Sequence, residues 1–167
     1  MRTLFIAAGF LLSVAMAGEA QPAGASQPAS AEQGAVLNVV QRFFDAMAAR
    51  DPVALQEVTV PEGRFFALVD DNGQPSMRSS TNEEFTRSLA AGTEALLERM
   101  WNPEVRIHGR IATVWAPYDF YRGRAFSHCG IDAFNLVKTP SGWKISGGVY
   151  TVERTGCPPS PLGPPKR

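Results

Sequence analysis

The sequence has no net charge and few cysteines, and it lacks the motifs that mark common functions. Its 16 basic and 16 acidic residues give a formal net charge of zero. Nucleic-acid binding depends on clustered Lys and Arg that neutralise phosphates, and the chain contains no such cluster. We therefore expect no nucleic-acid partner.

The chain also lacks the sequence patterns of metal sites and of several catalytic classes. Neither of its two cysteines sits in a CxxC or another metal-ligand spacing. It has no nucleophile elbow, no phosphate-cradling glycine loop and no dinucleotide fingerprint. We expect no metal and no cofactor.

The N-terminal residues predict export. Arg2 precedes an apolar run that ends at Ala17, and the small-x-small triplets ending at Ala17 and Ala20 are typical of signal peptidase sites. The run is shorter than the roughly 20 apolar residues that a membrane span needs. We expect residues 1–20 to form a cleaved signal peptide, which would make the mature protein periplasmic or secreted with no membrane span. An uncleaved anchor is the alternative.

Two segments with little to bury flank one central domain. Residues 21–33 would lose entropy on ordering without burying apolar surface, and the Pro-rich residues 157–167 suit neither a helix nor a central strand. We expect a disordered linker, a domain over residues 34–156 and a disordered tail. An even cysteine count in an exported protein suggests a disulfide between Cys129 and Cys157. A buried free Cys129 is the alternative.

The order of the expected elements predicts an α+β fold. Apolar periodicity and N-cap signals predict helices at 35–50, 52–58 and 82–91. Strand signals occur at 64–69, 76–80, 94–108, 111–121, 126–138 and 143–152, with a break expected at Asn102-Pro103. Helices on one face of long, bent, mostly antiparallel strands would form a cone-shaped barrel.

The hairpin between residues 111 and 138 supplies the candidate site. If Gly123-Arg124 is a two-residue turn, Asp119 lies opposite His128, and their side chains share a face. The candidate ligand-binding residues on the same face are Trp115, Tyr121, Phe126, Asp132 and Phe134. Aromatic walls with a few ionisable groups are typical of a small-molecule pocket. A register slip of one residue would invert the whole set.

Asp119 and His128 form the candidate catalytic pair. A carboxylate that orients an imidazole supports general acid or base catalysis. The alternative is a cross-strand pair that only fixes the register and contributes about 0.2 to 1 kcal/mol. By the same register Tyr118 points to the outer face, unless Pro117 introduces a bulge. Glu98-Arg99 is interpreted as a surface pair.

Several motifs resemble the nuclear transport factor 2-like superfamily. They are Phe43-Phe44-Asp45-Ala46, the tract from Trp115 to Tyr121, the tract from Ser127 to Phe134, and Gly142-Trp143-Lys144-Ile145. The chain is most similar to small bacterial members called SnoaL-like or "putative lumazine-binding", over residues 35–153. The resemblance implies a cystatin-like cone that commonly dimerises through the outer face of its sheet. Members include ketosteroid isomerases, polyketide cyclases and dehydratases, but no catalytic residue carries over at a matched position.

The function that we expect from the sequence is non-catalytic binding of a small apolar or aromatic ligand by an exported homodimer. One alternative is a cofactor-free isomerase, cyclase or dehydratase that uses the Asp119–His128 pair. The other is an interaction module whose cone is filled by its own side chains, including Phe65 and Phe120.

Overall fold

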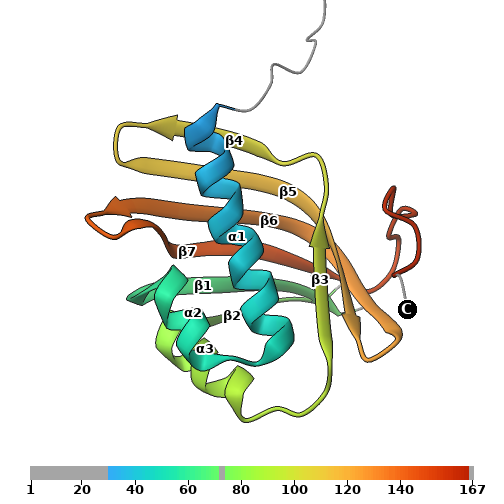
Figure 1. The fold of residues 1–167 in the computed structure, drawn as a ribbon. Coiled ribbons are helices and arrows are strands. Elements are labelled where there is room, and N and C mark those ends of the chain that lie inside the picture. The colour runs from blue at the N-terminus through green and yellow to red at the C-terminus, as the bar shows by residue number, and fades with distance from the viewer. Residues whose placement is uncertain (1–29, 72–73, 166–167) are drawn as a thin grey trace, which may run out of the picture.

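The computed structural model describes residues 30–71 and 74–165. The expected signal peptide and most of the expected linker lie outside these residues. In the described part, three helices pack on one face of a curved seven-stranded sheet (Figure 1). The sheet is not closed, and the expected α+β cone is confirmed.

The helices begin at the caps that the sequence predicts, with one exception. Helix α1 spans Ala31–Ala49 and starts earlier than expected, because Ser30 and Gln33 form a capping box. Helix α2 spans Pro52–Val58 and is capped by the Asp51 side chain. Helix α3 spans Asn82–Ala90, with Thr81 and Glu84 in the predicted capping box. Helix α1 lies across the sheet and covers its inner face (Figure 1).

The sheet combines an antiparallel meander with one parallel pairing. Its strands are β1 Thr59–Asp71, β2 Gln74–Thr81, β3 Leu96–Met100, β4 Glu104–His108, β5 Ile111–Arg122, β6 Ala125–Thr139 and β7 Gly142–Glu153. Their order is β2-β1-β7-β6-β5-β3, and β4 also pairs with β5. Only the β1–β7 pairing is parallel among the described strands. The expected break between β3 and β4 contains Asn102, which has a positive φ of 45°.

A bulge in the β5–β6 ladder changes the register that the turn predicts. Tyr121 pairs with Phe126 as expected, but the next pair is Phe120 with His128, so Ser127 is an extra residue. Beyond the bulge, Asp119 pairs with Cys129 rather than with His128. The predicted pairing of Asp119 with His128 is therefore wrong. These two side chains point to opposite faces of the sheet.

Aromatic rings join the helices to the inner face of the sheet. The ring of Phe43 on α1 lies 5.5 Å from Phe65 on β1, 5.6 Å from Phe85 on α3 and 5.9 Å from Phe134 on β6, measured between ring centroids. Aromatic contacts in this range add to the stability gained from apolar burial. These contacts hold α1, α3 and the sheet together around the Phe43 ring.

The C-terminal segment is attached to the domain although it contains no strand or helix through residue 165. Cys129 and Cys157 form the expected disulfide. Further along, the Gly163 carbonyl accepts a hydrogen bond of 2.9 Å from the Arg99 guanidinium. The part of the expected tail that the structure describes is thus held at two points.

We predict that Cys157→Ser lowers the free energy of unfolding by about 3 kcal/mol, because the bond closes a chain loop and restricts the unfolded state. The cysteines are 28 residues apart. Guanidinium denaturation with and without a reductant measures the effect, and Ser160→Ala in the same segment serves as the control. An unchanged denaturation midpoint in Cys157→Ser would show that the bond adds no stability.

Candidate functional site

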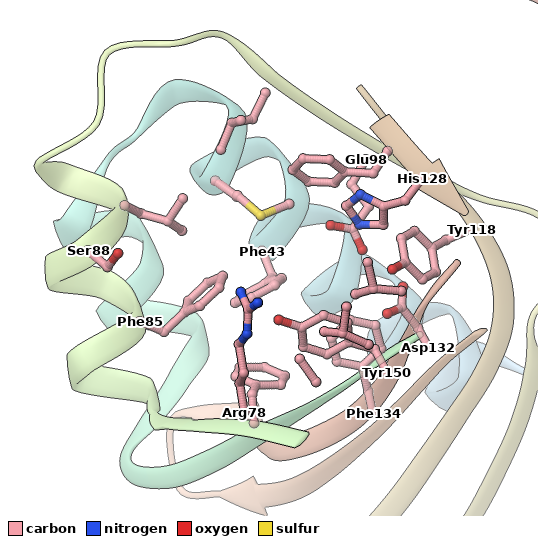
Figure 2. Close-up of a pocket in the computed structure, with 18 of the residues that line it drawn as sticks. Phe43, Arg78, Phe85, Ser88, Glu98, Tyr118, His128, Asp132, Phe134 and Tyr150 are labelled. Atoms are coloured by element: carbon pink, nitrogen blue, oxygen red, sulfur yellow. The ribbon is translucent and has the colours of Figure 1, made fainter. Parts of the chain in front are cut away.

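A cavity of about 310 Å³ lies between the helices and the inner face of the sheet (Figure 2). A water molecule in the liquid occupies about 30 Å³, so this space exceeds that of a few waters. Most of its walls are aromatic or aliphatic. The polar lining residues are Arg78, Ser88, Glu98, Tyr118, Arg122, His128, Asp132 and Tyr150. The expectation of a cone filled by its own side chains does not fit this cavity.

The bulge divides the predicted site residues between the two faces of the sheet. His128, Asp132 and Phe134 on β6 line the cavity, as the sequence predicts. The expected partners on β5 do not line it. Trp115, Asp119 and Tyr121 lie on the outer face, where Trp115 is 52% exposed. Phe126 lies beside the hairpin turn and is 46% exposed.

Asp119 has a structural role on the outer face. It is buried and accepts hydrogen bonds from two guanidinium nitrogens of Arg99, one of them with an Nε–Oδ1 distance of 2.9 Å. The interpretation of Glu98-Arg99 as a surface pair is wrong. Because neighbours on a strand point to opposite faces, Arg99 meets Asp119 outside while Glu98 enters the cavity.

Glu98 and Asp132 form a hydrogen-bonded carboxyl pair in the cavity wall. Burial raises the pKa of Asp132 to about 7. Burial and the charge of Asp132 raise the pKa of Glu98 well above its usual range. Two carboxyl groups can hydrogen-bond to each other only if at least one holds a proton. The pair therefore shares a proton at neutral pH.

The Asp132 side chain has an unsatisfied oxygen. Asp132 is 3% exposed, and its Oδ2 has no hydrogen-bond partner within residues 30–71 and 74–165. An unpaired polar atom in an apolar setting costs free energy. A ligand in the cavity that pairs with this oxygen would offset the cost.

Two tyrosines flank the carboxyl pair in the cavity wall. Tyr118, expected on the outer face, instead points inward and donates a hydrogen bond of 2.6 Å to the Thr151 carbonyl. Its ring needs a glycine opposite, since a Cβ at Gly130 would lie 2.8 Å from a Tyr118 ring carbon. Burial and the nearby Glu98 and Asp132 raise the pKa of Tyr118 and of Tyr150. Both phenols are therefore protonated at neutral pH.

His128 is a neutral wall residue. Its ring stacks on Phe120 at 4.8 Å between centroids, and its Nδ1 lies 3.0 Å from the Ser127 hydroxyl. Burial, together with the charges of Arg154 and Arg122, lowers the pKa of His128 to about 4. The imidazole is therefore uncharged at pH 7.

Arg78 enters the cavity from β2, beside Phe85 and Tyr150 (Figure 2). It forms no hydrogen bond or ion pair with any residue in the described ranges. The sequence shows Arg78 only as one polar residue in a polar strand, so no local pattern could single it out. The inward Tyr118 was missed because the predicted register placed it on the outer face. Glu98 was missed because it was interpreted as part of a surface pair with Arg99.

The described residues contain no group of three or more His, Cys, Asp or Glu that could hold a metal ion. The same part of the chain has no helix of the length and apolar character needed to cross a membrane.

We predict that the stability difference between Asp132→Asn and the unchanged protein depends on pH. Between pH 4 and 7 the unfolded chain releases the Asp132 proton while the folded protein keeps it, so the free energy of unfolding falls as pH rises. Asp132→Asn removes this pH dependence. Between pH 4 and 7 the free energy of unfolding of the variant should therefore rise relative to that of the unchanged protein, by on the order of a few kcal/mol.

Urea denaturation of both proteins at pH 4, 5.5 and 7 measures this gain. The lowered pKa of His128 acts in the opposite direction, but it is present in both proteins and largely cancels. Parallel stability curves for the two proteins would contradict the raised pKa of Asp132.

Comparison with known proteins places this geometry in a family. Residues 31–151 match the family described as "Putative lumazine-binding". Comparison with curated proteins finds no match.

Solved structures share the fold at low sequence identity. An NTF2-like protein from Cytophaga hutchinsonii aligns with a TM-score of 0.62 and 14% identity, over 74% of this chain and 99% of that one. An NTF2-like protein with a cystatin-like fold from Novosphingobium aromaticivorans aligns with a TM-score of 0.60 and 14% identity, over 75% of this chain and 84% of that one. A Streptomyces avermitilis protein described as a putative dehydratase of the NTF2-like family aligns with a TM-score of 0.55 and 19% identity, over 71% of this chain and 94% of that one.

These likenesses confirm the NTF2-like fold that the sequence motifs indicate. The family match covers most of the chain and includes helix α1, strands β1 to β6 and most of β7. The chain belongs to the putative lumazine-binding family, and it shares the fold of NTF2-like proteins.

Proposed function

We propose that the mature protein is an exported homodimer that binds a small, largely aromatic ligand in the cavity and catalyses no reaction. The observation that carries this proposal is the aromatic cavity, whose wall holds a buried Asp132 oxygen that is unpaired among the described residues. A cavity with apolar walls and a few polar groups is the usual form of a small-molecule site.

The size and chemistry of the cavity suit a flat ligand. Its volume of about 310 Å³ is at the lower end of the range for ligand pockets. The family description names lumazine, a planar heteroaromatic compound with hydrogen-bonding edges. A ligand of one or two rings matches both the aromatic walls and the carboxyl pair.

Export is supported by two features at opposite ends of the chain. The first residues have the pattern of a secretory signal peptide. The disulfide between Cys129 and Cys157 suits an oxidising compartment, where such bonds form and persist. We therefore place the mature protein in the periplasm or outside the cell.

Dimerisation is supported by an apolar row on the outer face of the sheet. Trp115, Ala133, Val149 and Phe66 pair in register across β5, β6, β7 and β1. Trp115 is 52% exposed and Val149 is 42% exposed. Exposed apolar patches commonly mark interaction sites, and a second copy of the same face would cover this one.

Native mass spectrometry of the mature protein, purified gently after export, tests the proposal. We expect the mass of a dimer with one small molecule per chain. Ala67→Phe should remove the adduct, because Ala67 lines the cavity. Asn135→Phe, exposed on the outer face of β6, is the matched control and should keep it.

A neutral fluorescent probe, N-phenyl-1-naphthylamine, tests the empty protein independently. Its fluorescence should rise saturably with the unchanged protein and with Asn135→Phe, but not with Ala67→Phe. If the purified protein carries no adduct and the probe does not bind, the binding proposal fails.

Proton transfer on the bound ligand is a second candidate function. The observation that favours it is the proton-sharing Glu98–Asp132 pair, since the pKa of Asp132 near 7 suits a group that both accepts and donates protons. A structural neighbour is described as a putative dehydratase. This candidate replaces the Asp119–His128 pair, whose members lie on opposite faces.

Deuterium incorporation distinguishes an enzyme from a binding protein. If the second candidate is right, the molecule released from the purified protein should take up deuterium when it is incubated with fresh protein in D₂O. Glu98→Gln should slow this exchange by at least tenfold while retaining the adduct. Exchange no faster than in buffer alone would leave only the binding function.

A further inference from the structure

Arg78 and Asp132 lie in one row across the inner face of the sheet. Arg78 pairs with Ala67, Ala67 pairs with Tyr150, and Tyr150 pairs with Asp132. Paired residues on adjacent strands point to the same face. The row therefore aims a cation from β2 and a carboxyl group from β6 into the same cavity.

The spacing of this row matches a small ring. Three strand steps of about 4.8 Å separate the two backbones by roughly 14 Å, and the long Arg78 side chain spans part of that distance. Ala67 is small and leaves the floor of the cavity open next to Arg78. Tyr150 itself stands in the row between Ala67 and Asp132, and Phe85 lies on the other side of Arg78 (Figure 2). An aromatic ring with a polar group at each end can therefore reach both ends of the row by packing against the Tyr150 ring.

Each end of the row has unused hydrogen-bonding capacity within the described ranges. The Arg78 side chain lines the cavity, is exposed to solvent, and has no hydrogen bond or ion pair there. Arg122, the other cation in the cavity wall, already contacts Glu94 and the Phe120 ring. At the far end of the row, Asp132 Oδ2 is buried and unpaired.

We propose that the ligand is a hydroxylated aromatic acid, with its carboxylate on Arg78, its ring over Ala67 and against the Tyr150 ring, and its hydroxyl group on Asp132. A carboxylate can accept two parallel hydrogen bonds from a guanidinium. A hydroxyl group both donates and accepts, so it pairs with Asp132 in either protonation state. This inference rests on the proposed binding function and names the class of its ligand.

Displacement of N-phenyl-1-naphthylamine by three matched compounds tests the ligand class. The compounds are 4-hydroxybenzoate, 4-hydroxybenzamide without the charge, and benzoate without the hydroxyl group. We expect 4-hydroxybenzoate to displace the probe at a concentration at least tenfold lower than the amide and several-fold lower than benzoate.

Two substitutions should each remove one preference. Arg78→Gln should abolish the preference for the acid over the amide, and Asp132→Leu should abolish the preference for the hydroxyl group. Arg106→Gln removes the same charge from an exposed position on the outer face, and this control should keep both preferences. Probe binding by each variant shows that its cavity is intact.

The outcomes separate this inference from the function on which it rests. If the probe binds but the acid displaces it no better than the amide, the ligand class is wrong and the binding function stands. An equal loss of acid preference in Arg78→Gln and Arg106→Gln would also overturn the assignment of Arg78. If neither the probe nor any of the three compounds binds, both proposals fail.

Discussion

The β5–β6 ladder accommodates Ser127 as an extra residue between the pairs Tyr121–Phe126 and Phe120–His128. Because side chains alternate along a strand, this one insertion reverses the face of every β5 residue beyond it relative to β6. Tyr118 and Phe120 enter the cavity as a result, while Asp119 and Trp115 leave it. The chemistry of the cavity wall thus depends on a local irregularity of the backbone.

The same alternation links the two faces of β3. On the outer face, Arg99 is held by Asp119 and by the Gly163 carbonyl of the segment that the disulfide attaches to β6. On the inner face, its neighbour Glu98 reaches Asp132. The contacts of Arg99 on the outer face therefore position Glu98 in the cavity without touching it. Through Gly163, the C-terminal segment contributes to the site without lining it.

The cavity combines groups that are costly to bury. Glu98 and Asp132 reduce their cost by sharing a proton, yet one Asp132 oxygen has no hydrogen-bond partner in the part of the chain that the structure describes. A protein that required only stability would fill this space with apolar side chains, since cavities and unsatisfied polar groups both lower stability. The arrangement is understandable if a ligand completes it.

The sequence by itself determined the elements and the fold class. Local signals such as the Thr81–Glu84 capping box, the Asp51 cap and the Asn102-Pro103 break act within a few residues, and all are present in the structure. The motifs of residues 115–134 also indicated the superfamily, and the cysteine count indicated the disulfide.

Only the tertiary structure decided which residues meet. Three cavity residues on β6, His128, Asp132 and Phe134, were found from sequence because they alternate along one strand. Their partners come from other strands, and a bulge of one residue leaves no reliable mark in the sequence. Arg78 and Glu98 join them through pairings between strands far apart in the chain. Long-range register, set by packing rather than by local preference, assembled the site.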